Sequence, residues 1–143
     1  MKKMFFALLL TIFSFSCENE RISYFNPYLP EMTVHLLVNL NLPSYAPLNY
    51  ANQSIIETSQ GYNGVIVHNT GVGFAAYEAT CSNHVINNQS VLVLNGQVAE
   101  CTHCQREYLL INGQPIDNGI NSTYGLKPYH VSQSGSMLTI TNF

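Results

Sequence analysis

The sequence predicts an all-β domain, a sandwich or small barrel of about nine short strands joined by tight turns. Three observations support this class. Apolar and polar residues alternate with a period of two, and no segment carries the long stripe of an amphipathic helix. Asn-Gly pairs separate several of the apolar runs, as they do at hairpin turns. Asn, Ser, Thr and Tyr are plentiful, whereas Lys, Glu and Ala, which favour helices, are scarce.

The first residues have the features of a targeting segment and not of a domain. Lys2 and Lys3 precede an apolar run, Met4–Phe15, which is too short to span a bilayer but has the length of a signal-peptide core. The run ends at Ser16-Cys17, a small residue followed by a cysteine, as in bacterial lipoprotein signals that are cleaved before a lipidated cysteine. We therefore expect a signal peptide over residues 1–16 and lipidation at Cys17. An ordinary secretory signal with an incidental cysteine is the alternative.

Residues 17–31, "CENERISYFNPYLPE", are expected to form a lipid-anchored flexible tether, because their two prolines interrupt regular structure. The acidic "CENE" resembles the export tags of surface lipoproteins in Bacteroidetes-type bacteria. These features predict a protein of the cell envelope, held by its lipid on the periplasmic side or at the outer-membrane surface. The remaining residues, 32–143, are long enough for a single domain with one core.

The first half of the domain reads as one strand followed by a hairpin. "TVHLLV" (33–38) alternates as a strand does, and "NLPSYAPLNYANQS" (41–54) is a loop with two prolines. "GVIVHN" (64–69) and "GFAAYEAT" (73–80) then flank a turn at Thr70-Gly71. We expect these two segments to pair as antiparallel strands.

Three turn signals organise the second half of the chain. In "VLVLNGQVAE" two short strands flank Asn95-Gly96, the dipeptide typical of a type I′ turn, in which both residues take positive φ. The same pair recurs at Asn112-Gly113. In "GLKPYHVSQSGSMLTITNF" a last hairpin is expected around Ser134-Gly135.

The cysteines and histidines gather between residues 80 and 108. Cys81-x-x-His84 is followed after sixteen residues by Cys101-x-x-Cys104, and His103 lies inside the second pair. Each short motif adjoins a predicted strand, so both motifs are expected on loops at one end of the sheet. Two cysteines at C-x-x-C spacing, closed by a Cys/His pair from elsewhere, suit a tetrahedral metal ion.

The stretch resembles the Rieske ferredoxin family, in which two cysteines hold one iron of a 2Fe-2S cluster and two histidines hold the other. "GVIVHNTGVGFAAYEATC" is similar to the strands that lead into the first cluster loop of that family. "CTHCQREYLLINGQPI" is similar to the second loop, and "GLKPYHVSQSGSMLTI" to the closing hairpin. The resemblance covers the chain from about residue 33 to the C-terminus. It implies a Rieske-like antiparallel β-sandwich or small barrel with a two-loop tip that bears the cysteines.

The resemblance carries over to the ligands only in part. Cys81 and Cys101 fall on the family's two cysteines. Asn83 stands at the first histidine position, with His84 one residue later. An Asn does not replace imidazole as an iron ligand, so we expect Asn83 to fill that position while His84 turns away from the site.

At the second histidine position the sequence has Cys104, with His103 one residue earlier, and Gln105-Arg106 replaces the usual Gly-Ser. If a 2Fe-2S cluster is bound, the resemblance places Cys81 and Cys101 on one iron. His84 and either Cys104 or His103 would then hold the other iron.

Two further interpretations of the cysteines remain open. Zinc could be held by Cys81, His84, Cys101 and Cys104. Alternatively, no metal binds, and Cys81 forms a disulfide with Cys101 or Cys104, as exported chains readily do. All three interpretations require the cysteines to lie together on two adjoining loops. His84 should face the site if a metal binds and point to solvent if a disulfide forms.

The expected function follows from these interpretations. Two functions are expected as alternatives: an electron-transfer protein of the envelope with a redox partner, or a non-redox structural or binding lipoprotein. Five basic residues against eight acidic ones give a formal charge of −3 with no basic patch, which excludes nucleic acid as a partner. No nucleophile elbow or phosphate loop is present, so we expect no enzyme acting alone. The other polar and aromatic candidates are expected to be ordinary face or core residues of the strands: His35, His68, His130, Glu78, Glu107, Tyr77, Tyr108, Tyr124 and Tyr129.

Overall fold

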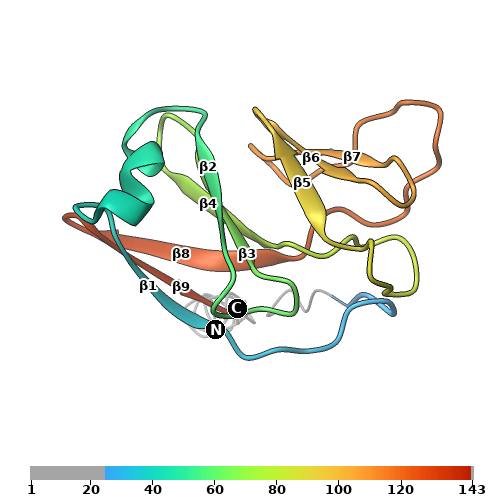
Figure 1. Ribbon diagram of the computed structural model, residues 1–143, viewed down its shortest axis with the longest axis horizontal. Coiled ribbons are helices and arrows are strands. Elements are labelled where there is room, and N and C mark those ends of the chain that lie inside the picture. The colour runs from blue at the N-terminus through green and yellow to red at the C-terminus, as the bar shows by residue number, and fades with distance from the viewer. Residues whose placement is uncertain (1–24, 143) are drawn as a thin grey trace, which may run out of the picture.

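The computed structural model describes residues 25–142 (Figure 1). Within them lie nine strands and one short 3-10 helix, so the predicted all-β class is confirmed. In chain order these are β1 (His35–Asn39), η1 (Pro43–Asn49), β2 (Ser54–Glu57), β3 (Val65–Asn69), β4 (Phe74–Glu78), β5 (Leu92–Asn95), β6 (Val98–Cys101), β7 (Glu107–Leu109), β8 (Pro128–Ser134) and β9 (Met137–Thr141).

The strands form two antiparallel sheets. The larger has the order β1-β9-β8-β4-β3-β2 and curls into a half-barrel, and the smaller has the order β5-β6-β7. Figure 1 shows the small sheet beside one end of the large one, joined to it by the chain that leaves β4. One apolar cluster, which includes Val38, Leu48 and Ile140, fills the curl of the large sheet. A second cluster lies where the two sheets meet and contains Cys81 and Cys101.

The predicted hairpins form, but one turn differs from its expected type. Asn95 pairs with Val98, so the two loop residues are Gly96 and Gln97. Gly96 has a φ of 62°, whereas Asn95 is not among the described residues with positive φ. Positive φ at the first loop residue alone is the pattern of a type II′ turn. The type I′ prediction is therefore wrong, because the strand continues through Asn95 and the turn starts one residue later.

The loop expected over residues 41–54 contains the helix η1. Pro43 lies in its first turn, where a proline needs no hydrogen-bond donor, and Pro47 lies inside it. Leu48 from this helix is fully buried in the larger apolar cluster. The helix thus contributes an apolar side chain to the cluster inside the curled sheet.

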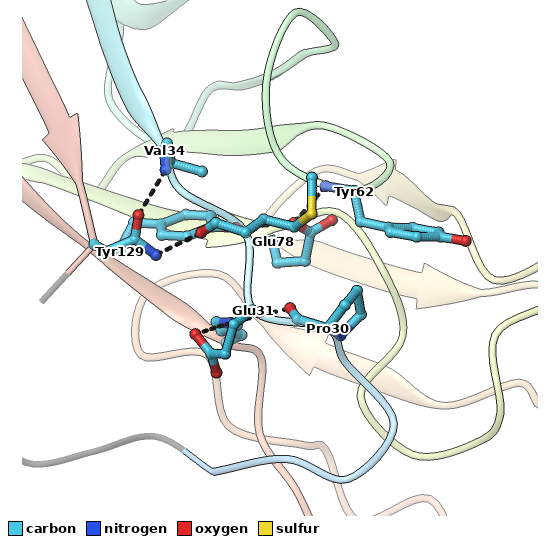
Figure 2. Close-up of polar contacts among 9 residues, drawn as sticks. Pro30, Glu31, Val34, Tyr62, Glu78 and Tyr129 are labelled. Atoms are coloured by element: carbon cyan, nitrogen blue, oxygen red, sulfur yellow. Dashed lines mark hydrogen bonds and ion pairs between the residues drawn. The ribbon is translucent and has the colours of Figure 1, made fainter.

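Part of the expected tether packs on the domain. Asn26 and Leu29 are buried, and the amide of Asn26 donates to the backbone oxygen of Ser82 over 2.8 Å. The buried ammonium of Lys127 lies 3.1 Å from a carboxylate oxygen of Glu31 and donates to the Pro30 oxygen over 3.4 Å (Figure 2). Residues 26–31 therefore run along the fold and touch the loop that follows β4.

Glu78, expected on a solvated face, is buried at the end of β4. Its carboxylate accepts hydrogen bonds from the backbone of Tyr62 and Asn63 over 2.9 and 3.1 Å (Figure 2). It also accepts from the hydroxyls of Thr80 and Tyr129 over 2.7 and 2.9 Å. Burial, followed by the charge of Glu78, raises the pKa of Tyr129. The carboxylate thus joins the 62–63 loop to β4 and β8.

The predicted signal peptide (1–16), lipidation of Cys17 and the tether as far as residue 24 lie outside the described residues. From residue 25 to residue 142, no helix has the length and apolar character needed to cross a membrane.

Candidate metal centre

Two loops bring the cysteines together at the junction of the two sheets. Cys81 follows β4, and its backbone N–H donates to the Ser90 oxygen over 2.9 Å, which closes the first loop. Cys101 ends β6, and the Gln105 N–H returns to its carbonyl over 2.7 Å, which forms a tight second turn. Gln105 adopts a φ of 58°, which is unusual for a residue other than glycine. This turn places Cys104 beside Cys101.

The four expected zinc ligands form one compact group. One ligand atom each from Cys81, His84, Cys101 and Cys104 lies within 4.8 Å of all the others. The Cys81 and Cys104 sulfurs are 3.7 Å apart, and Nε2 of His84 is 3.2 Å from the Cys101 sulfur. The expected proximity of the three cysteines is therefore confirmed.

His84 faces the site, so the expectation that it turns away is wrong. Its Nδ1 lies 2.8 Å from the carbonyl oxygen of Val85. Because a carbonyl only accepts hydrogen bonds, this contact puts the proton of a neutral imidazole on Nδ1 and leaves the Nε2 lone pair directed at the sulfurs. Asn83, at the position that holds a histidine in the Rieske family, instead bonds Tyr108 and the backbone of residues 123 and 124, and His84 faces the thiols in its place.

The structure contains no disulfide among the three described cysteines, and it leaves His103 out of the four-residue group. Cys81, Cys101 and Cys104 are free thiols in the structure, so the disulfide alternative receives no support from it. His103 does not belong to the compact group. It lies outside the site with its ring centroid 4.7 Å from that of His84, and its Nδ1 is 3.4 Å from the side-chain oxygen of Gln89. His103 is thus a neighbour of the candidate ligand His84.

A polar layer behind the thiols was missed in the sequence. The buried hydroxyl of Tyr108 lies 3.3 Å from the Cys81 sulfur, and the Asn83 amide donates to that hydroxyl over 2.9 Å. Burial and the contact with Cys81 raise the pKa of Tyr108, so it stays protonated. The alternation along β7 was the available signal. Tyr108 pairs with Ala99, two residues before Cys101, and so shares the inward face of that cysteine.

The thiols are electrostatically unequal before any ion binds. The hydrogen bond between Cys81 and Cys101 lowers the pKa of Cys101, against the opposing effect of its burial. The same hydrogen bond, together with burial, raises the pKa of Cys81. Cys101 is therefore the first of the two to ionise, as a thiol must do to bind a metal.

Arg106 supplies the positive charge next to the thiols. Contact with Cys104 raises the pKa of its guanidinium, which also donates to the Asn121 oxygen over 3.2 Å from Nε and 3.0 Å from a terminal nitrogen. The sequence showed Arg106 only as a departure from Gly-Ser. Its contacts join the second cysteine loop to the 115–122 loop.

Comparison with solved structures supports the expected architecture. The ferredoxin in "Complex of reduced oxygenase and oxidized ferredoxin in carbazole 1,9a-dioxygenase" matches with a TM-score of 0.50 and 19% identity. The match covers 78% of this chain and 94% of that one. The fold is Rieske-like. No protein-family model matches the sequence, and no curated protein is significantly similar to it. At this identity the Rieske-like match establishes the fold alone.

The donor set of this Rieske-like domain fits a bound metal. Thiolate and imidazole are ligands of zinc and of iron–sulfur centres, and three sulfurs with one ring nitrogen complete a tetrahedral set. The group is formed by side chains from two loops that share a buried base and a half-buried rim. The residues present could therefore hold a metal ion or a cluster without rearrangement of the fold.

Proposed function

We propose that this protein is a Rieske-like lipoprotein of the cell envelope that binds one structural zinc ion through Cys81, His84, Cys101 and Cys104. The observation that carries the proposal is the mutual proximity of the four ligand atoms, all within 4.8 Å of one another. When bound, the ion would supply a cross-link between the two cysteine loops and thus hold the small sheet against the large one.

The compactness favours one ion over two. Around a single tetrahedral zinc at about 2.3 Å, sulfur ligands lie roughly 4 Å apart, so every pair is close. The 3.7 Å between the Cys81 and Cys104 sulfurs agrees with this spacing. A two-iron cluster divides its four ligands into two pairs on opposite irons, and ligands of opposite pairs must lie farther apart. The contact between His84 and Cys101, which are on opposite irons in the cluster assignment, argues against such a division.

The charges around the site also suit a zinc ion with three thiolates, which keeps one net negative charge. Arg106 lies beside Cys104 and offsets that charge. The hydroxyl of Tyr108 at the Cys81 sulfur offsets it further from the buried side.

The envelope location rests on the sequence. Lys2, Lys3 and the apolar run before Ser16-Cys17 support a cleaved signal and a lipid on Cys17. The partner of the N-terminal lipid is the membrane. Residues 26–31 then lie directly on the domain, which would sit close to the membrane at the end of a short linker.

Metal analysis of the protein purified without added metal tests the zinc assignment. We expect one zinc per chain and little iron. After exchange with Co²⁺ we expect the intense visible bands of a tetrahedral ion and a thiolate charge-transfer band in the near ultraviolet. The matched variant Cys104→Ser should lose most of this absorption. A reduced protein that binds neither ion would rule out the proposal.

A second candidate is electron transfer through a 2Fe-2S cluster with an envelope redox partner. The Rieske-like fold and the hydrogen bond from Tyr108 to a cysteine sulfur favour it, because such bonds tune the potential of a cluster. Here Cys81 and Cys101 would hold one iron and His84 with Cys104 the other. Anaerobic reconstitution with iron and sulfide decides between the candidates. Two irons and two sulfides per chain, with an electron paramagnetic resonance signal on reduction, would replace the zinc proposal.

A further inference from the structure

We propose that Asn83 is a positioning residue of the metal centre, whose amide fixes the Tyr108 hydroxyl as a hydrogen-bond donor to the Cys81 sulfur. The proposal rests on the proposed function, in that the sulfur of Cys81 is taken as a metal ligand. It assigns to Asn83 the tuning of metal affinity through a second residue and not through contact with the ion.

The side chain of Asn83 is fully engaged by three residues. Its Nδ2 donates to the Tyr108 hydroxyl oxygen over 2.9 Å and to the Tyr124 carbonyl over 2.6 Å. Its Oδ1 accepts from the backbone N–H groups of Thr123 and Tyr124 over 2.8 and 2.9 Å. These contacts fix which end of the amide is the nitrogen, because Oδ1 faces two donors and Nδ2 faces a carbonyl. Asn83 therefore cannot rotate its amide without losing several hydrogen bonds.

This orientation determines where the Tyr108 proton points. A phenol group has one proton to donate, and here its oxygen already accepts a hydrogen bond from the Asn83 amide. The other polar contact of that oxygen is the Cys81 sulfur at 3.3 Å. Tyr108 is fully buried, so bulk water does not compete for the proton. The hydroxyl must donate to the sulfur, and this bond strengthens once Cys81 is a thiolate.

The same side chain fastens the segment before Leu126 to the first cysteine loop. Residues 123 and 124 belong to the connection that leads into β8, far from the cysteines in sequence. Through three of its four hydrogen bonds, Asn83 joins these two residues to the first cysteine loop. A merely structural role would end there. A positioning role also requires an effect at the sulfur itself.

Asn83→Asp and Tyr108→Phe test the relay, alone and together. An aspartate keeps the shape of Asn83 but cannot donate, so the Tyr108 proton would turn to the carboxylate and leave the sulfur. The matched control is Asn69→Asp. Asn69 also donates to a carbonyl, that of Leu48 over 2.8 Å, and accepts from the Gly71 N–H over 2.8 Å, but it lies in β3 and is not a member of the metal group.

Zinc affinity is measured by chelator competition, and the sulfur-to-metal charge-transfer band is measured in the Co²⁺ form. We expect Asn83→Asp and Tyr108→Phe each to weaken zinc binding about 10- to 100-fold. The double variant should bind zinc no more weakly than the single variant with the lower affinity, because both changes remove the same hydrogen bond to the Cys81 sulfur. Both should move the charge-transfer band to lower energy, since a sulfur without its donor gives up electrons more readily. Asn69→Asp should change neither reading.

Wild-type affinity in Asn83→Asp, an unshifted band, or fully additive losses would each overturn the proposal. If Asn83→Asp does not fold, Asn83→Ser removes the amide without adding charge and is read by the same criteria. Should the wild-type protein bind no metal, the proposed function fails but the relay is still measurable. The Tyr108 hydroxyl proton should then give a slowly exchanging resonance in the reduced, metal-free protein, and this resonance should change its chemical shift in Asn83→Asp, where the proton turns from the sulfur to the carboxylate. Absence of that resonance in the wild type would contradict the relay.

Discussion

Nε2 of His84 and the sulfur of Cys101 lie 3.2 Å apart, although the two residues are separated by 17 positions in the chain. The contact joins the two cysteine loops at the rim of the site. The imidazole is held at its other nitrogen as well, because Nδ1 of the same ring lies 2.8 Å from the Val85 oxygen. A histidine held in this way presents one nitrogen to the thiols and needs no rotation to bind a metal ion.

Replacement of His84 and of His103 should separate a ligand from its neighbour. Changes in residues around a ligand typically cost about 10- to 100-fold in metal affinity, so loss of the ligand in His84→Ala should cost at least about 100-fold. His103→Ala removes a ring that lies tilted against His84 outside the compact group, and should change the affinity little. Competition with a zinc chelator measures both. Equal losses in the two variants would remove His84 from the ligand set.

Glu78→Gln should destabilise the domain by about 2 kcal/mol or more, because a buried polar group left without its partners carries that cost. The new amide group would face backbone N–H groups at Tyr62 and Asn63 that already need an acceptor. Urea unfolding at constant metal concentration measures the difference. Glu107→Gln, at a half-buried position on β7, is the control and should stay within about 0.5 kcal/mol of wild type. A Glu78 variant as stable as that control would refute the role of the carboxylate.

Stability should fall on mild acidification because of His68. This residue is buried, and its burial lowers the pKa of the imidazole in the folded state. The unfolded chain therefore takes up a proton first, and the folded state loses stability as the pH falls below about 6.5, the ordinary histidine pKa. Its Nδ1 lies 2.8 Å from the Ser54 hydroxyl, while its buried Nε2 has no hydrogen-bond partner within residues 25–142.

The check is the urea midpoint of the metal-free protein between about pH 7.5 and 5. His68→Gln should flatten the dependence in this range even if it lowers stability throughout. His35→Gln, at an exposed position on β1, should keep the wild-type slope. An unchanged slope in His68→Gln would assign the effect to other groups.

Cys17→Ala should release the protein from the membrane fraction without lowering its melting temperature. The prediction follows from the proposed lipid on Cys17. Within residues 25–142, the contact that fastens the N-terminal segment to the first cysteine loop is made by Asn26 and not by the lipid site. Fractionation of cells, together with labelling by a fatty-acid analogue, measures anchoring. If the variant remains in the membrane fraction and still takes up label, the anchor lies elsewhere in the chain.

The sequence by itself determined the β class, most strand positions and the grouping of the cysteines. Period-two alternation and turn residues such as Gly96 and Gly135 act over a few neighbours, so they are readable without knowledge of the rest of the chain. The Cys81-x-x-His84 and Cys101-x-x-Cys104 spacings predicted a shared site. Each pair adjoins a predicted strand, which places both pairs on loops at one end of the sheet.

Only the tertiary structure decided which side chains face that site. Asn83 and His84 are adjacent in an irregular loop, and their directions are set by distant partners, Tyr124 for one and Cys101 for the other. Tyr108 read as a core aromatic because its contact with Cys81 spans 27 positions. Glu78 read as solvated because its donors come from segments distant in sequence, the 62–63 loop and strand β8. Local pattern fixes the backbone, whereas the direction of a loop side chain depends on contacts that exist only after the sheets have come together.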